Sequence, residues 1–251
     1  MEKTVKIGIL DTGFDSRALE YFSKRPSFYD SPTSQIVETM SDTSGHGTAI
    51  ALLIGSNSKL KSSIYGLCPT AEYYIAKITD SFGFSNSEYI HRALLFMAEQ
   101  DVDIINISFG GSEYNEEIRQ DCDYLKQQGC FVIAPSGDDG CDEEVLFPAD
   151  YEAVYSIAAQ DKNGDVFQTA NSKSMNGTSN ILAPGYEIPS RVVYANASSG
   201  VSGVNWEPQR KRWRAKITVK RKTIFLGYFK NKEDAIKARI EGERKYWNPL
   251  L

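Results

Sequence analysis

The sequence predicts an α/β fold, a doubly wound parallel sheet, followed by a small α+β domain in which a three-stranded antiparallel sheet packs on one helix. Apolar runs alternate with helical patterns over about the first 200 residues, and a basic, strand-like pattern follows them. Charge divides in the same way: residues 203–251 hold 14 Lys and Arg against 5 Asp and Glu, and residues 1–202 hold 14 against 28. We therefore expect two domains, residues 1–200 and residues 201–251, with a polyanion as the partner of the second.

Short apolar runs rich in β-branched residues predict strands that are buried on both faces. They are Val5–Leu10, Tyr73–Ile78, Asp103–Phe109 and Cys130–Pro135. Helical patterns lie between them at residues 46–56, 85–100 and 112–129, and the last ends at Gly129 as a C-cap. In such a sheet the loops at the carboxyl ends of the strands carry the chemistry.

Two of these loops hold residues that fit acid–base chemistry. Asp11 follows the first strand in "LDTGFDS", and His46 lies between two glycines in "SDTSGHGTAIA". An Asp that orients an imidazole and a His that takes a proton from a hydroxyl are two members of a charge-relay triad. Taken singly, each residue is more often structural, as we expect for His91 within "EYIHRALLF".

The motifs "DTG", "SGHGTAIA", "NISFGG", "APSGDDG" and "ILAPG" occur in the order and approximate spacing of the subtilisin-like serine proteases, which residues 1–200 resemble. The resemblance implies hydrolysis of peptide bonds in a protein or peptide substrate. It implies Asp11 as the orienting acid and His46 as the general base. It also implies that Ser108, Phe109 and Gly110 line the substrate cleft by backbone pairing.

The oxyanion loop departs from the family pattern. The family has an asparagine after the glycine of this loop, and "SGDDG" places Asp138 there. An ionised carboxylate only accepts hydrogen bonds, so it opposes the negative charge that the reaction develops. Loss of one oxyanion donor costs on the order of 100- to 1000-fold in rate.

The nucleophile has two interpretations. Ser179 in "NGTSN" precedes "ILAPG", whereas the family's serine follows it, so by position Ser202 matches the nucleophile. The family continues with a small-residue helix, but here Pro208 and a basic cluster follow, which predicts a protease domain truncated at the nucleophile motif. Ser202 is therefore either the nucleophile of the protease domain or part of the first turn of the second domain. In the second case, a gene fusion has joined the two domains without a flexible linker.

The second domain resembles the Apetala/ethylene-response-factor type of DNA-binding domain through "SGVSGVNW", "KRWRAKI", "IFLGYF" and "EDAIKA". The resemblance implies that residues 203–247 bind DNA and that the sheet enters the major groove. Trp213 is expected in the core. The expected DNA contacts are Trp206, Arg210, Arg212, Arg214, Lys216, Lys220 and Lys222, the last two on phosphates.

Composition and cysteine spacing predict the cellular compartment of the protein and its metal binding. The sequence shows no targeting signal and no apolar run long enough to span a membrane, which predicts a cytoplasmic protein. The four cysteines lack CxxC spacing, so we expect free thiols and no metal site. Whether the protein binds a structural calcium ion, as many relatives do, is left open, because the acidic surplus permits ion binding without locating a site.

Two functions follow from the sequence. The first is a subtilisin-like serine endopeptidase of weak or absent activity that carries a DNA-binding domain. The second is an inactive protease remnant or gene fusion whose surviving activity is DNA binding through the C-terminal sheet.

Overall fold

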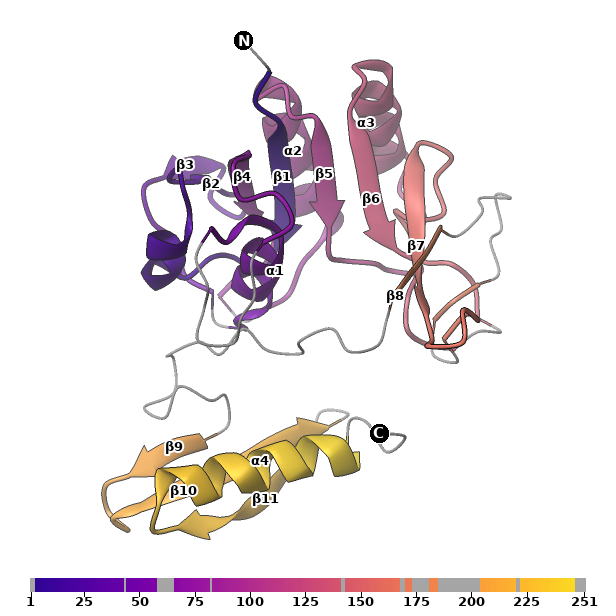
Figure 1. The fold of residues 1–251 in the computed structure, drawn as a ribbon. Helices are drawn as coiled ribbons and strands as arrows, with labels where there is room; N and C mark the ends of the chain where they lie inside the picture. The colour runs from indigo at the N-terminus through magenta and orange to yellow at the C-terminus, as the bar shows by residue number, and fades with distance from the viewer. Residues whose placement is uncertain are drawn as a thin grey trace. The chain divides into compact units, whose positions relative to one another are not determined.

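A computed structural model gives the fold and describes residues 3–42, 44–57, 66–81, 83–140, 143–167, 170–172, 181–184, 204–219 and 222–246. The chain divides into two compact units, Met1–Ser190 and Arg191–Leu251 (Figure 1). The boundary expected at residue 200 lies outside the described residues, so it stays a prediction.

The first unit contains a mostly parallel sheet with the strand order β3-β2-β4-β1-β5-β6-β7-β8. Its strands are β1 (Lys6–Asp11), β2 (Ser27–Asp30), β3 (Gln35–Val37), β4 (Glu72–Lys77), β5 (Ile104–Ile107), β6 (Phe131–Pro135), β7 (Val154–Gln160) and β8 (Ile181–Pro184). Only the β2–β3 pair is antiparallel among the described strands of this sheet. The chain leaves β1 on one side towards β2 and β4 and then continues on the other side through β5, so the strand order reverses at β1. Ligand sites of open α/β sheets lie at such a reversal, beyond the carboxyl ends of the strands.

Helices cover both faces of this sheet, as a doubly wound fold requires. They are α1 (His46–Gly55), α2 (Ser87–Glu99) and α3 (Glu116–Gln127), with a short 3-10 helix at Ser16–Tyr21. In Figure 1, α2 and α3 lie behind the sheet and α1 lies in front of it. Asn86 and Asn115 start α2 and α3 because their side chains accept hydrogen bonds from the backbone N–H groups of Tyr89 and Ile118.

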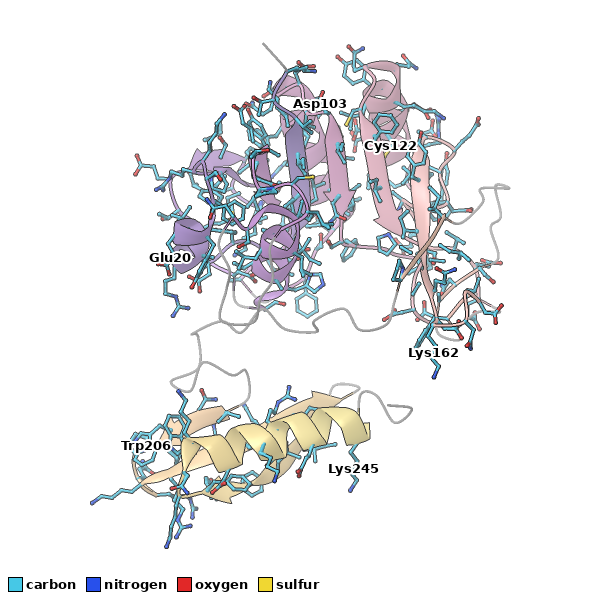
Figure 2. The ribbon with its side chains drawn as sticks, in the orientation of Figure 1. Glu20, Asp103, Cys122, Lys162, Trp206 and Lys245 are labelled. Carbon is cyan, nitrogen blue, oxygen red and sulfur yellow. The ribbon has the colours of Figure 1, made fainter. Side chains whose placement is uncertain are left out.

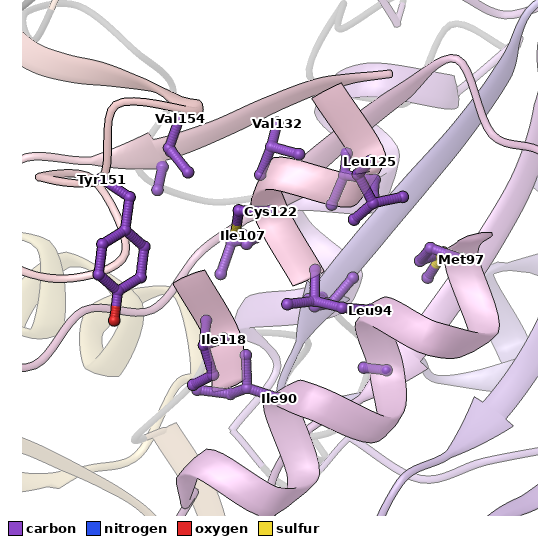
Figure 3. Packing of buried hydrophobic residues seen from close by; sticks show 14 of the residues in the cluster. Ile90, Leu94, Met97, Ile107, Ile118, Cys122, Leu125, Val132, Tyr151 and Val154 are labelled. Carbon is purple, nitrogen blue, oxygen red and sulfur yellow. The ribbon is translucent and has the colours of Figure 1, made fainter. Parts of the chain in front are cut away.

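The main core lies between the sheet and the pair α2 and α3. Ile90, Leu94 and Met97 of α2 belong to one buried cluster with Cys122 and Leu125 of α3 (Figure 3). Strand residues of β5 and β6 complete the same buried cluster. This core holds the central strands rigidly, and it therefore fixes the loops that begin at their carboxyl ends.

The α/β class predicted from the sequence is confirmed, and the four predicted strands correspond to β1, β4, β5 and β6. The strands β2, β3, β7 and β8 were not predicted from the sequence. In β7, Val154, Ser156 and Ala158 are buried and alternate with Tyr155 and Ile157. The apolar and polar residues themselves do not alternate there, so the sequence carries no clear strand pattern.

The second unit contains the predicted antiparallel sheet, with the strand order β11-β10-β9. Its elements are β9 (Val204–Glu207), β10 (Arg212–Val219), β11 (Lys222–Phe229) and α4 (Lys232–Tyr246). Val204, Ala215 and Ala235 form its buried cluster, with Trp213 and Leu226 packed against them. A strand irregularity between Ala215 and Lys216 shifts the register against β11.

Candidate active site

Asp11 and His46 lie at the point where the strand order reverses. Asp11 is the last residue of β1, and its side chain is only 1% exposed. His46 is the first residue of α1, and its side chain is 52% exposed. The carboxylate of Asp11 is therefore buried, whereas solvent or a substrate can reach the imidazole of His46.

The two side chains are paired. Nδ1 of His46 lies 2.8 Å from Oδ1 and 3.1 Å from Oδ2 of Asp11, and the backbone N–H of Thr12 donates to Oδ1 at 2.7 Å. Because the carboxylate accepts from Nδ1–H, the lone pair of the imidazole is on Nε2. The hydrogen bond to Asp11 raises the pKa of His46, against the opposing effect of its burial. The pair can thus accept a proton at Nε2.

Glycines make this approach of the two segments possible. A Cβ on Gly47 would lie 2.3 Å from the carbonyl oxygen of Gly13 and 3.0 Å from Cβ of Asp11. Gly45 has φ 80° at the N-cap of α1, which is the left-handed conformation that glycine adopts without strain. The glycines on both sides of His46 are therefore required by packing and backbone geometry.

The expected substrate-binding segment, residues 108–110, leaves β5 at the same edge of the sheet. The N–H of Ser108 donates to the carbonyl oxygen of Leu10 at 3.1 Å, and Nδ2 of Asn106 donates to Oγ of Ser108 at 2.7 Å. Ser108, Phe109 and Gly110 are half-buried. Their role in substrate binding stays a prediction.

Asp138 is exposed in the loop that follows β6. A residue that the sequence analysis missed, Asn171, anchors this loop and is 1% exposed. Its Oδ1 accepts from the N–H groups of Asp139 at 2.8 Å and Gly140 at 3.2 Å, and its Nδ2 donates to the carbonyl oxygen of Glu144 at 2.6 Å. No sequence signal marks Asn171, because its partners are about 30 residues away along the chain.

The serine that would complete a triad lies outside the described residues. Neither Ser202 nor Ser179 is among the described residues. Ser179 is also excluded as the nucleophile by sequence order, because it precedes "ILAPG". Both interpretations of Ser202 therefore stay predictions.

His91 also has an aspartate partner, but it lies on the helices and away from the strand ends. Its Nδ1 lies 2.7 Å from Oδ2 of Asp121, and its Nε2 lies 3.5 Å from Oε1 of Glu117. Burial raises the pKa of Asp121. The pair links α2 to α3, which fits the structural role expected for His91.

The register of the C-terminal sheet separates the expected DNA contacts. Trp206, labelled in Figure 2, pairs with Trp213 in the neighbouring strand, and their ring centroids are 5.4 Å apart. Trp206 therefore lies on the face of the sheet that carries Trp213. Arg212, Arg214 and Lys216 alternate with Trp213 along β10 and therefore point to the other face. The register therefore places Trp206 on the face opposite these basic residues. Its contact with DNA stays a prediction.

Two aromatic rings share the face of Arg214 and Lys216. Tyr228 lies opposite Arg214 and Phe225 opposite Lys216, and their ring centroids are 4.9 Å apart. The guanidinium of Arg210 lies 5.0 Å from the ring centroid of Tyr228. Lys220 lies outside the described residues, and Lys222 is described only as the first residue of β11.

Within the described ranges, no group of three or more His, Cys, Asp or Glu side chains could hold a metal ion. The calcium question stays open. No helix within the same ranges has the length and hydrophobicity that crossing a membrane requires.

Comparison with known proteins identifies the family. Residues 2–216 match the Subtilase family, so the chain belongs to it. Subtilisin NAT of Bacillus subtilis subsp. natto is 28% identical over 192 residues, which are 74% of this chain and 48% of that protein. The major intracellular serine protease of Bacillus subtilis (strain 168) is 28% identical over 194 residues, which are 74% of this chain and 59% of that protein. The chain thus spans about half the length of these relatives.

Solved structures show the same fold. The psychrophilic subtilisin-like protease Apa1 of Pseudoalteromonas sp. AS-11 has a TM-score of 0.59 at 23% identity, covering 72% of this chain and 41% of that one. The prenylagaramide maturation protease PagA has a TM-score of 0.59 at 20% identity, covering 95% of this chain and 72% of that one. The family match crosses residue 200, so it supports neither the expected truncation there nor a fusion to a second family.

Proposed function

We propose that this chain is a serine endopeptidase in which Asp11 orients His46 and His46 acts as the general base. The observation that carries the proposal is the 2.8 Å contact between Nδ1 of His46 and a buried carboxylate at the carboxyl end of β1. The residues fall within a chain that belongs to the Subtilase family.

In the proposed reaction, Nε2 of His46 takes the hydroxyl proton of Ser202 while Oγ attacks the carbonyl carbon of the scissile peptide bond. The protonated imidazole, stabilised by Asp11, then gives this proton to the leaving amine. Water hydrolyses the resulting acyl-enzyme by the same base. Residues 108–110 would hold the substrate backbone in an extended conformation next to these groups.

Asp138 sets the rate in this proposal. Its carboxylate stands where the family has an oxyanion donor, so the tetrahedral intermediate lacks one hydrogen bond and meets a like charge. We therefore propose that the chain hydrolyses peptide bonds slowly. If the missing donor abolishes hydrolysis altogether, the chain is the inactive protease remnant.

Hydrolysis of a fluorescently labelled protein substrate tests the proposal. The His46→Ala variant should lose the activity, and the matched variant His91→Ala, which also loses an Asp-paired imidazole, should keep it. Equal activity in the His46→Ala variant would refute the assignment. No activity in the folded native chain would favour the inactive remnant.

We propose DNA binding by the C-terminal unit as a second function. The supporting observation is the shared face of β10 and β11, where Arg212, Arg214 and Lys216 lie with the rings of Phe225 and Tyr228. Guanidinium and ammonium groups contact phosphates and base edges, and a β-sheet face fits the major groove. Affinity for duplex DNA should then fall steeply with salt concentration, whereas salt-independent retention would contradict it.

We also propose that the chain works in the cytoplasm. One relative carries the name major intracellular serine protease, and Cys68, Cys122 and Cys130 are free thiols. Cell fractionation with an antibody against the chain tests this proposal, and recovery from the culture medium alone would contradict it.

A further inference from the structure

The helix that carries His46 begins without a capping side chain of its own. Its N-cap is Gly45, which has none to offer. The first N–H groups of a helix need acceptors, so neighbouring segments must supply them. Oγ1 of Thr12 accepts from the N–H of Gly47 at 3.0 Å, and Oδ2 of Asp42 accepts from the N–H of Thr48 at 2.8 Å.

The carboxylate of Asp42 accepts further hydrogen bonds. The residue is buried, with only 5% of its surface exposed. Its Oδ1 accepts from Oγ1 of Thr12 at 2.9 Å and from the N–H of Gly45 at 2.7 Å. Its Oδ2 also accepts from Oγ1 of Thr48 at 2.6 Å. One side chain thus bonds to the residue after Asp11 and to residues on both sides of His46.

We infer that Asp42 is a positioning residue, a buried carboxylate that replaces the missing cap of α1 and fixes His46 against Asp11. The inference rests on the proposed function for its catalytic meaning, but its geometry does not depend on the nucleophile. Asp42 stands within the motif "SDTSGHGTAIA", but its contact with Thr12, across 30 residues of chain, is visible only in the structure.

Charge gives Asp42 a second effect on the imidazole. A helix N-terminus carries partial positive charge, which disfavours protonation of a histidine at that position. A carboxylate among the same N–H groups opposes this field. The pKa of His46 is raised chiefly by its hydrogen bond to Asp11, and the charge of Asp42 adds in the same direction.

Titration of the full chain by NMR tests the inference without requiring activity, because the chain has two histidines. In Asp42→Asn, which is nearly isosteric and uncharged, the titration midpoint of His46 should fall and that of His91 should stay. The control Asp80→Asn removes a charge from a loop in which Oδ1 accepts from the N–H of Phe84, and it should leave both midpoints unchanged.

A merely structural role predicts a different result. An unchanged His46 midpoint in Asp42→Asn, with only a lower melting temperature, would overturn the inference. If Asp42→Asn does not fold, Thr12→Val keeps the carboxylate and cuts its link to the segment after β1. The Nδ1 proton of His46 should then exchange faster with solvent, and unchanged exchange would likewise overturn the inference.

A kinetic measurement connects the inference to the reaction. In Asp42→Asn the rate of covalent labelling by a fluorophosphonate should fall on the order of 10- to 100-fold, because a displaced base loses its alignment. The acid limb of the pH profile should move to lower pH, in step with the histidine titration. A native chain that does not label would refute the proposed function, while the titration would still decide the role of Asp42.

Discussion

Nδ1 of His46 and Oδ1 of Asp11 lie 2.8 Å apart, although the two residues are separated by 35 positions in the chain. The contact joins the end of the central strand to the first turn of α1. We expect Asp11→Asn to lower the hydrolysis rate on the order of 10,000-fold, because an amide favours the wrong imidazole tautomer. Steady-state kinetics on a peptide substrate checks this, and a loss below tenfold would contradict the role of Asp11.

The raised pKa of His46 predicts the pH dependence of the reaction. The base must be neutral, so activity is present above the pKa of His46 and is lost as pH falls through it. Because that pKa is above the ordinary histidine value, the acid limb of kcat/KM should lie at higher pH than for an unpaired histidine. In Asp11→Asn the limb should move to lower pH. A limb that stays in place would exclude His46 as the titrating base.

Asp138 offers a gain-of-function prediction. Asp138→Asn restores a donor to the oxyanion loop, so kcat should rise on the order of 100- to 1000-fold, with KM changed little. The matched variant Asp139→Asn alters the next carboxylate of the same loop and should have a much smaller effect. Equal effects of the two substitutions would show that general loop charge, and not the position of Asp138, sets the rate.

Asn171 predicts a coupling between a buried amide and the same loop. Asn171→Ala removes the acceptor of the N–H groups of Asp139 and Gly140, so these amides should exchange with solvent faster. Hydrogen exchange followed by mass spectrometry measures this on peptides that span the loop. Unchanged exchange there would show that other contacts hold the loop.

The C-terminal face predicts how DNA affinity depends on salt. Lys222→Ala, which removes an expected phosphate contact, should weaken binding and reduce the slope of log K against log salt by about one phosphate contact. Lys237→Ala removes an exposed lysine of α4 instead and should leave the slope unchanged. Fluorescence anisotropy over a salt series distinguishes them. The same slope for both variants would mean that the sheet face is not the contact surface.

The sequence predicted the parts of the site that local motifs carry, and it missed the parts that only tertiary contacts create. Asp11 and His46 each stand in a short, distinctive motif, and they pair where the carboxyl end of β1 meets the first residue of α1. Asp42 stands four residues before His46 in the same motif, but its contact with Thr12 is visible only in the structure. Asn171 acts through partners about 30 residues away, so no local pattern marks it.

The face on which Trp206 lies also cannot be derived from the local sequence. Successive strand residues point to opposite faces, so the side on which a residue lies depends on register. The pairing of Trp206 with Trp213 places it away from Arg212 and Arg214, which sequence alternation within β10 alone could not decide.

The most direct test of the proposed triad is fluorophosphonate labelling of the purified chain, followed by mapping of the modified peptide. The account predicts modification at Ser202 that disappears in His46→Ala and persists in His91→Ala. Absence of labelling in a folded sample, or equal labelling of Ser202 in His46→Ala, would contradict the claim that Asp11 and His46 activate a serine.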